Sequence, residues 1–201
     1  IFAVSDSGRP MIDIFKLKGE ISINDSRRYA IKRVNSGRAE NELVLFNRYW
    51  GENTATNEFG TEVRLRPLTR FAVNATIPVL VEAKRLYGPP LRLGAGTYVV
   101  SGHGTADTFL QQATAVGDTA NLHFTLSPGN AKISQAIGGL PRLIRNNQIE
   151  IRWRAEGASE SFARNRHPRT AVGFTADRKT LYLLTVDGRQ EGYSVGMTCL
   201  L

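Results

Sequence analysis

The segment Met11-Ile12-Asp13-Ile14-Phe15-Lys16-Leu17 alternates largely between apolar and polar side chains, and it decides the fold class. After Gly19 the alternation resumes at Ile21 and Ile23. A period of two is typical of a half-buried β-strand, and a glycine between two such runs favours a turn. The segment therefore predicts a β-hairpin that turns near Gly19.

The same period recurs along the chain, whereas one segment has the period of a helix. Thr105 can cap this helix, Phe109, Leu110 and Ala113 share one face, and Gly117 ends it. Further strands are expected at residues 29–34, 42–49, 61–66, 79–86, 97–101, 119–126, 148–153, 171–174 and 181–186. We therefore predict the α+β class, with a single β-rich mixed domain of few helices that covers residues 1–201.

Both ends of the sequence lead us to expect an incomplete domain. Residues 1–5 lack an initiator methionine, a basic segment and an apolar segment, so they do not form an intact signal peptide. Residues 197–201 are typical of the first turn of a helix that does not continue. We expect an internal fragment of a longer protein, with a helix that begins near Thr198.

Composition excludes several classes of protein. Of the 201 residues, 41% are hydrophobic and 22% are charged, which suffices for a core and argues against disorder. No apolar run reaches the roughly 18 residues that a membrane-spanning helix needs. Cys199 is the sole cysteine, which excludes an intramolecular disulfide and a cysteine-based zinc site. His103, His123 and His167 lack zinc-ligand spacing, so we predict no cofactor, and an oxygen-ligand site for Ca²⁺ stays open.

The basic residues indicate the kind of partner. The formal net charge is +8, and 20 of the 26 basic residues are arginine. The guanidinium fork matches phosphate and carboxylate oxygens, so the surplus of arginine indicates an anionic partner. Apart from residues 27–28, 32–33 and 152–169, the basic residues lie singly between strands and form no stripe with aromatic residues. We therefore predict no nucleic-acid partner.

Residues 101–105, Ser-Gly-His-Gly-Thr, lie where a strand ends and the helix begins. Gly102 and Gly104 let the backbone approach a ligand, and the amides of a helix N-terminus favour an anion. His103 is then a candidate acid, base or hydrogen-bond donor to phosphate. A tight turn with a capping histidine fits the same residues equally well.

A second glycine-containing segment lies at residues 136–143. The pair Gly138-Gly139 suggests a strained turn that presents Arg142 to a phosphate group. An ordinary turn with a solvated arginine is the alternative.

The segment at residues 164–171 holds three arginines and His167 immediately before an apolar strand. Charged loop tips often carry function while the strand behind them holds the position. Pro168 restricts the backbone in front of Arg169. We therefore favour a functional loop over a merely solvated one.

The apolar run at residues 181–186 predicts a buried strand, and Asp187-Gly188 turns the chain at its end. Asp187 and Arg189 leave this strand at its tip, which is a usual place for site residues. An ordinary turn aspartate is the alternative.

Residues 192–196, Gly-Tyr-Ser-Val-Gly, match the G-x-S-x-G pattern of hydrolase nucleophiles. That elbow needs a strand directly before it and a helix directly after it. Here a polar loop at residues 187–191 precedes Ser194, and His167 lies upstream of it. We therefore do not predict a serine hydrolase.

Taken in order, these segments resemble the phosphodiester glycosidase family. The most specific stretches are residues 166–173, 183–190 and 192–198. Residues 101–104 and 138–142 support them, residues 51–63 resemble the bacterial form, and the resemblance covers about 34–198. Family members continue through a helix into an Asn-Leu-Asp-Gly-Gly-Gly-Ser motif. The resemblance therefore implies a fragment that lacks this segment.

The resemblance also implies a function. It is a glycosidase that hydrolyses a sugar-1-phosphodiester, such as a diester of N-acetylglucosamine-1-phosphate, in glycan or exopolysaccharide metabolism. The partner is a sugar-phosphate or anionic glycan, and the location is extracellular or in the cell envelope. A non-catalytic envelope module that binds anionic glycopolymers is the alternative.

Residue chemistry suggests a role for each candidate. Asp187 supplies the carboxylate that an oxocarbenium-like transition state needs, and His103 donates a hydrogen bond to the leaving phosphate. The side chains and glycines expected to contact the substrate are Arg142, Arg169, Arg189, His167, Gly102, Gly104, Gly138 and Gly139.

Overall fold

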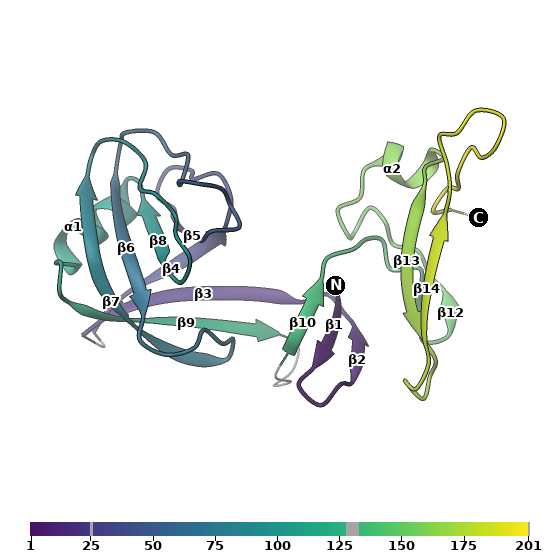
Figure 1. Ribbon diagram of the computed structural model, residues 1–201, viewed down its shortest axis with the longest axis horizontal. Coiled ribbons are helices and arrows are strands. Elements are labelled where there is room, and N and C mark those ends of the chain that lie inside the picture. Colours follow the sequence, from purple (N-terminus) through teal and green to yellow (C-terminus); the bar gives the residue numbers. More distant parts are fainter. Residues whose placement is uncertain (25, 128–132, 201) are drawn as a thin grey trace. The chain divides into compact units, whose positions relative to one another are not determined.

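The computed structural model describes residues 1–24, 26–127 and 133–200. The chain divides into two compact units (Figure 1). The barrel unit comprises Lys16–Asn130, and the hairpin unit comprises Ile1–Phe15 together with Ala131–Leu201. The barrel unit is thus an insertion in the sequence of the hairpin unit. The predicted β-rich mixed fold with few helices is confirmed, while the extent of the domain, 1–201, stays a prediction.

Seven strands of the barrel unit close into a barrel in the order β3-β4-β5-β8-β6-β7-β9 (Figure 1). Strands β4 and β5 pair in parallel, and the other neighbours pair antiparallel, so the sheet is mixed. The strands are β3 (Lys16–Ile23), β4 (Arg27–Val34), β5 (Leu43–Phe46), β6 (Thr61–Pro67), β7 (Ala75–Leu86), β8 (Tyr98–Gly102) and β9 (Thr119–Ser127). Along β7, Ile77, Val79 and Val81 are buried and their neighbours are less so, as the period of two predicts.

The predicted helix is confirmed as α1 (Thr105–Ala113), which packs against β4, β6 and β8. Leu110 and Ala113 join the barrel core, and the Phe109 ring lies 5.1 Å from that of Tyr29. The cap differs from the prediction, because Gly104 rather than Thr105 is the N-cap residue.

The hairpin predicted to turn near Gly19 is wrong, because residues 16–23 form the single strand β3, which pairs with β4 instead. Strand β3 runs straight through Gly19, which pairs with Phe124 of β9. A Cβ atom at Gly19 would lie 2.5 Å from the Phe124 ring. This glycine is therefore required by the side chain of a neighbouring strand rather than by a bend.

Within its described residues, the hairpin unit contains three small sheets and one helix. Strands β10, β1 and β2 form the first sheet, β11 and β12 the second, and β13 and β14 the third. The elements are β1 (Phe2–Ser5), β2 (Pro10–Ile12), β10 (Ile133–Ile137), β11 (Ile144–Arg145), β12 (Gln148–Ile149), α2 (Glu160–Arg164), β13 (Arg169–Phe174) and β14 (Leu181–Val186). Within the described residues, its buried apolar side chains are those of Ala3, Trp153 and Ala163.

Three predictions for this unit need correction. The strand expected at residues 148–153 ends at Ile149, and residues 198–200 are not helical. The strand at residues 181–186 is confirmed, but it is not buried, since Leu183 is 75% exposed. Its apolar run forms one strand of a two-stranded hairpin instead of the centre of a larger sheet.

No helix in the described part of the chain is long and apolar enough to cross a membrane.

Candidate functional site

Two chain segments meet at one end of the β13–β14 hairpin, where Arg169 pairs with Val186. His167 and Met197 exchange two backbone hydrogen bonds of 3.2 and 3.0 Å. A Cβ atom at Gly196 would lie 2.5 Å from the His167 carbonyl carbon, and one at Gly188 would lie 2.7 Å from the Pro168 nitrogen. The two glycines thus allow the segments to pack backbone against backbone. We call residues 165–169, 187–190 and 194–197 the loop cluster.

The loop cluster brings the side chains of His167 and Arg189 into contact. The Arg189 Nη2 atom donates a hydrogen bond to His167 Nδ1 over 2.7 Å. The backbone of Arg189 has a φ of 57°, in the left-handed region that favours glycine. An arginine is thus held in an uncommon backbone conformation with its side chain directed at the histidine.

Ser194 fixes the position of Asp187 in the loop cluster. The Ser194 hydroxyl donates to the Asp187 carbonyl over 2.7 Å, and it accepts from the Gly196 amide over 3.3 Å. Ser194 also forms an isolated bridge with Gln190, and neither a strand nor a helix flanks it directly. Ser194 therefore braces a turn and is not a nucleophile elbow, as predicted. Among described residues, none donates a hydrogen bond to the exposed Asp187 carboxylate.

The Arg169 guanidinium holds the loop cluster together by donating hydrogen bonds to backbone carbonyls. Nε donates to the Met197 carbonyl over 3.0 Å, and Nη2 donates to the carbonyls of Phe162 and Asn165 over 2.6 and 2.9 Å. The guanidinium carbon also lies 4.6 Å from the centre of the Phe162 ring. Nη1 is buried and has no hydrogen-bond partner within the described part of the chain. Most of this predicted phosphate ligand is therefore engaged in holding the backbone.

Arg142 lies elsewhere in the hairpin unit. Its amide donates to a Glu156 carboxylate oxygen over 2.8 Å, and its Nε donates to the Ile144 carbonyl over 3.1 Å. The expectation of a strained turn at Gly138 and Gly139 is wrong. Neither glycine has a positive φ, and a Cβ atom at either would meet open space. The structure gives no steric reason for glycine at these two positions.

The predicted anion cradle around His103 belongs to the barrel unit. Gly104 has a φ of 60°, and a Cβ atom there would collide with the Asn41 side chain. Asn41 Oδ1 accepts the Thr105 amide over 2.9 Å and so satisfies the start of helix α1. A Cβ atom at Gly102 would lie 2.7 Å from the Ala106 backbone. Packing within the protein therefore explains both glycines without a ligand, and a role for His103 with Asp187 stays a prediction.

Sequence reasoning missed a buried carboxylate in the barrel unit. Glu62 has no exposed surface and accepts hydrogen bonds from Thr54, Thr56 and the Leu91 amide over 2.7, 2.8 and 2.7 Å. Arg85 Nη2 lies 3.1 Å from Oε2, the oxygen that also accepts the Leu91 amide. Burial alone raises the pKa of Glu62, but these hydrogen bonds and the Arg85 charge outweigh burial and hold the pKa below its ordinary value.

The hydrogen bonds of Glu62 hold neighbouring segments of the barrel unit together. It ties the loop at residues 51–60 and the segment after Leu86 to strand β6. The polar residues of the segment at 51–63 were the available signal, because that segment carries part of the family resemblance. The alternation of apolar and polar residues places Glu62 in a strand, but it does not indicate that the Glu62 carboxylate is buried.

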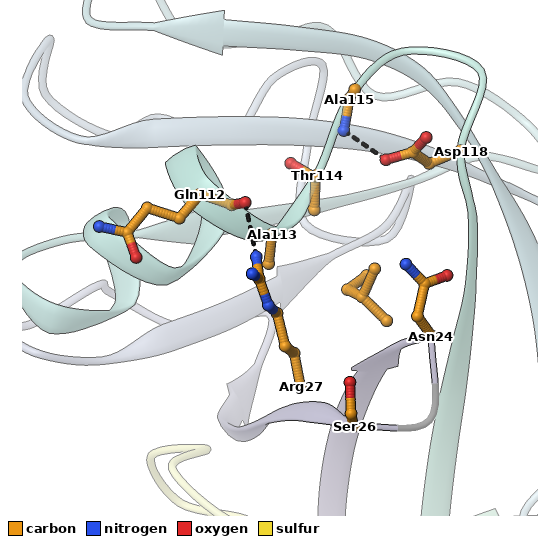
Figure 2. Close-up of a pocket in the computed structure, with 9 residues that line it drawn as sticks. Asn24, Ser26, Arg27, Gln112, Ala113, Thr114, Ala115 and Asp118 are labelled. Atoms are coloured by element: carbon orange, nitrogen blue, oxygen red, sulfur yellow. Dashed lines mark hydrogen bonds between the residues drawn. The ribbon is translucent and has the colours of Figure 1, made fainter.

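A pocket of about 420 Å³ opens on the barrel unit and holds none of the predicted site residues (Figure 2). Its charged side chains are already engaged by the protein. Arg27 donates to the Gln112 carbonyl over 2.8 Å, and Asp118 accepts the Ala115 amide over 2.7 Å. The described residues contain no group of three or more His, Cys, Asp or Glu that could hold a metal ion. The loop cluster is therefore the better candidate site.

Comparison with known families identifies the chain. The model of the phosphodiester glycosidase family matches residues 68–199, which is more than half of the sequence. The chain belongs to this family. The match includes all of the hairpin-unit candidates, from Gly138 to Arg189, and also His103. No curated protein matches the chain.

Two solved structures share the fold of this chain. A hypothetical protein from Synechocystis is 17% identical over 98% of this chain and 35% of its own, with a TM-score of 0.65. A presumed exported protein from Burkholderia pseudomallei K96243 is 19% identical over 98% of this chain and 46% of its own, with a TM-score of 0.63. The phosphodiester glycosidase chain therefore spans less than half the length of either protein.

Proposed function

We propose that the chain carries the site of a hydrolase that cleaves sugar-1-phosphodiesters of the N-acetylglucosamine-1-phosphate type. The loop cluster carries this proposal. In a chain of the phosphodiester glycosidase family, it gathers a histidine, three arginines and a carboxylate to which no described residue donates a hydrogen bond. These are His167, Arg166, Arg169, Arg189 and Asp187.

The proposed reaction releases the sugar and leaves the phosphate on its carrier. The bond between C1 and the phosphate oxygen breaks, and its electron pair stays on that oxygen. A water oxygen bonds to C1, and one water proton passes to solvent. Positive charge builds at C1 in the transition state, and the Asp187 carboxylate stabilises it or forms a transient bond to C1. Its exposure supports this assignment, as does the lack of any hydrogen-bond donor to it among the described residues.

The phosphodiester carries one negative charge, which cationic and hydrogen-bonding side chains must hold. Arg189, His167 and Arg169 lie within the loop cluster, where Nη1 of Arg169 has no hydrogen-bond partner among the described residues. Arg142 and the glycines at 138 and 139 are proposed as additional contacts from the same unit. His103, Gly102 and Gly104 in the barrel unit stay predictions.

Asp187→Asn tests the proposal most directly. We expect release of N-acetylglucosamine from an N-acetylglucosamine-1-phosphodiester to fall by about 10²–10⁴-fold, because the amide cannot stabilise the cation. Asp177→Asn is the matched control. Asp177 lies in the β13–β14 connection, where its carboxylate accepts from Thr175 and the Lys179 amide, and we expect little loss of turnover. Near-normal turnover in Asp187→Asn would overturn the role of Asp187.

A second outcome separates the two candidate functions. If the protein binds an anionic glycan but releases no sugar from any sugar-1-phosphodiester, it is a binding module of the cell envelope. We propose an extracellular or envelope location in glycan or exopolysaccharide metabolism. The fold shared with a presumed exported protein supports it. Fractionation of cells that express the protein tests the location.

A further inference from the structure

The His167 imidazole is held at one of its two nitrogens. Arg189 Nη2 lies 2.7 Å from Nδ1, and a guanidinium has donors but no acceptor. Nδ1 must therefore accept, which in a neutral imidazole leaves the proton on Nε2. Within the described part of the chain, no hydrogen bond engages Nε2. His167 thus keeps an unused N–H donor of defined identity.

The backbone around the pair is fixed on both sides. His167 exchanges two backbone hydrogen bonds with Met197, and Gly196 packs against its carbonyl. Arg189 occupies a φ of 57°, which is unfavourable for a residue with a Cβ atom. Such outliers persist where surrounding structure demands them, and they gather at functional sites. At this φ, the side chain of Arg189 reaches Nδ1 of His167.

We propose that Arg189 is a positioning residue, which locks His167 in the tautomer that donates from Nε2 to a phosphate oxygen of the substrate. The identity of this ligand rests on the proposed function. Arg189 acts through His167 on the oxygen that gains charge as the C1–O bond breaks. The hydrogen bond strengthens as that charge develops, and no proton needs to be transferred.

Two arginines of the same hairpin provide a matched pair of variants. Arg178 lies in the connection between β13 and β14 with a φ of 61°, and Arg189 follows β14 with a φ of 57°. Arg189→Gly and Arg178→Gly therefore relieve the same backbone conformation at opposite ends of the hairpin. Arg178→Gly also removes a hydrogen bond to the Pro10 carbonyl of 3.3 Å, so the free energy of unfolding of both variants is measured beside the spectra. A difference between them reports the contact with His167 rather than backbone strain.

The measurement is ¹⁵N NMR of the imidazole nitrogens in alkaline buffer, with His167→Gln to assign the signal. We expect wild type and Arg178→Gly to show a proton on Nε2 and a hydrogen-bonded Nδ1. In Arg189→Gly, a population protonated at Nδ1 appears. Dimethyl phosphate, a diester without a sugar, should shift the Nε2 signal in the first two proteins and much less in Arg189→Gly. Turnover in Arg189→Gly should fall about 10–100-fold, and in Arg178→Gly it should hold.

The outcomes separate this inference from the proposed function. A wild-type His167 protonated at Nδ1, or identical spectra for the two glycine variants, would overturn the role of Arg189, whatever the turnover. The expected spectra and dimethyl phosphate shift without any turnover of sugar-1-phosphodiesters would support the role of Arg189 and count against the proposed function.

Discussion

The barrel unit and the hairpin unit owe their order to different interactions. The barrel encloses a continuous apolar core and a buried carboxylate with its partners. In the hairpin unit, few described apolar side chains are buried, and arginines donate to backbone carbonyls at several points. Water competes with such hydrogen bonds more readily than with a core. The candidate site is therefore built in the part of the molecule that resists local opening least.

The largest expected difference concerns leucine side chains. Leu65 is fully buried in the barrel core, and Leu183 is 75% exposed on β14. Leu65→Ala should lower the free energy of unfolding by about 2–5 kcal/mol, because it removes packed apolar atoms and leaves a cavity. Leu183→Ala should change it by less than about 0.5 kcal/mol. Denaturant unfolding of the full chain measures both, and equal effects would erase the distinction between the units.

The buried ion pair predicts the next largest effect. Glu62→Gln leaves the guanidinium of Arg85, whose side chain is 12% exposed, without its counter-charge. It should cost about 3 kcal/mol of unfolding free energy. Glu20→Gln is the control, since Glu20 pairs with Arg28 in the same barrel but at the surface, and it should cost less than about 1 kcal/mol. A control as damaging as Glu62→Gln would show that burial is not what matters.

Acid should weaken the barrel through the same carboxylate. The folded pKa of Glu62 lies below its ordinary value of 4.5, so the unfolded chain binds the proton more readily. The contribution of Glu62 is complete above pH 4.5 and disappears as pH falls through the lower folded pKa. Wild type and Glu62→Gln should therefore converge in unfolding free energy below pH 4.5. A gap that stays constant into acid would contradict this linkage.

The smallest of these effects falls on the loop cluster. Gly196→Ala forces a Cβ atom against the His167 carbonyl at a φ of 84°, whereas Gly192→Ala has a φ of 72° and open space. We expect about 1–3 kcal/mol of local destabilisation for Gly196→Ala and less for Gly192→Ala. Hydrogen exchange at the amides of His167 and Met197 measures it. Equal exchange rates in the two variants would mean that the segments are not held by this close approach.

Local patterns predicted many elements of the fold. The period of two located most strands of the barrel, and one apolar face located helix α1. The hairpin turn was misplaced because glycine is needed at position 19 to make room for the ring of Phe124, a residue distant in sequence. The prediction that β14 is buried was wrong for a related reason. An apolar run indicates that a strand could be buried, but it does not show which elements pack against that strand.

The candidate site was predicted in part. The segments holding His167 and Asp187 were singled out, but their meeting depends on Gly188 and Gly196, whose packing partners are not visible in the sequence. The same is true of the contact between Arg189 and His167. Glu62 was missed because an isolated glutamate in a strand has no pattern that signals burial.

The insertion of the barrel has a consequence for folding during synthesis. Strand β1 leaves the ribosome before the barrel, but its partner β10 follows only after the entire barrel, since Phe2 pairs with Ile137. Closing so long a loop is entropically costly and slow. Folding of the barrel lowers this entropic cost, because Lys16 at the start of the barrel pairs with Ser127 near its end. Once the barrel has formed, the flanking segments are tethered near one another, and β1 searches for β10 across a short distance.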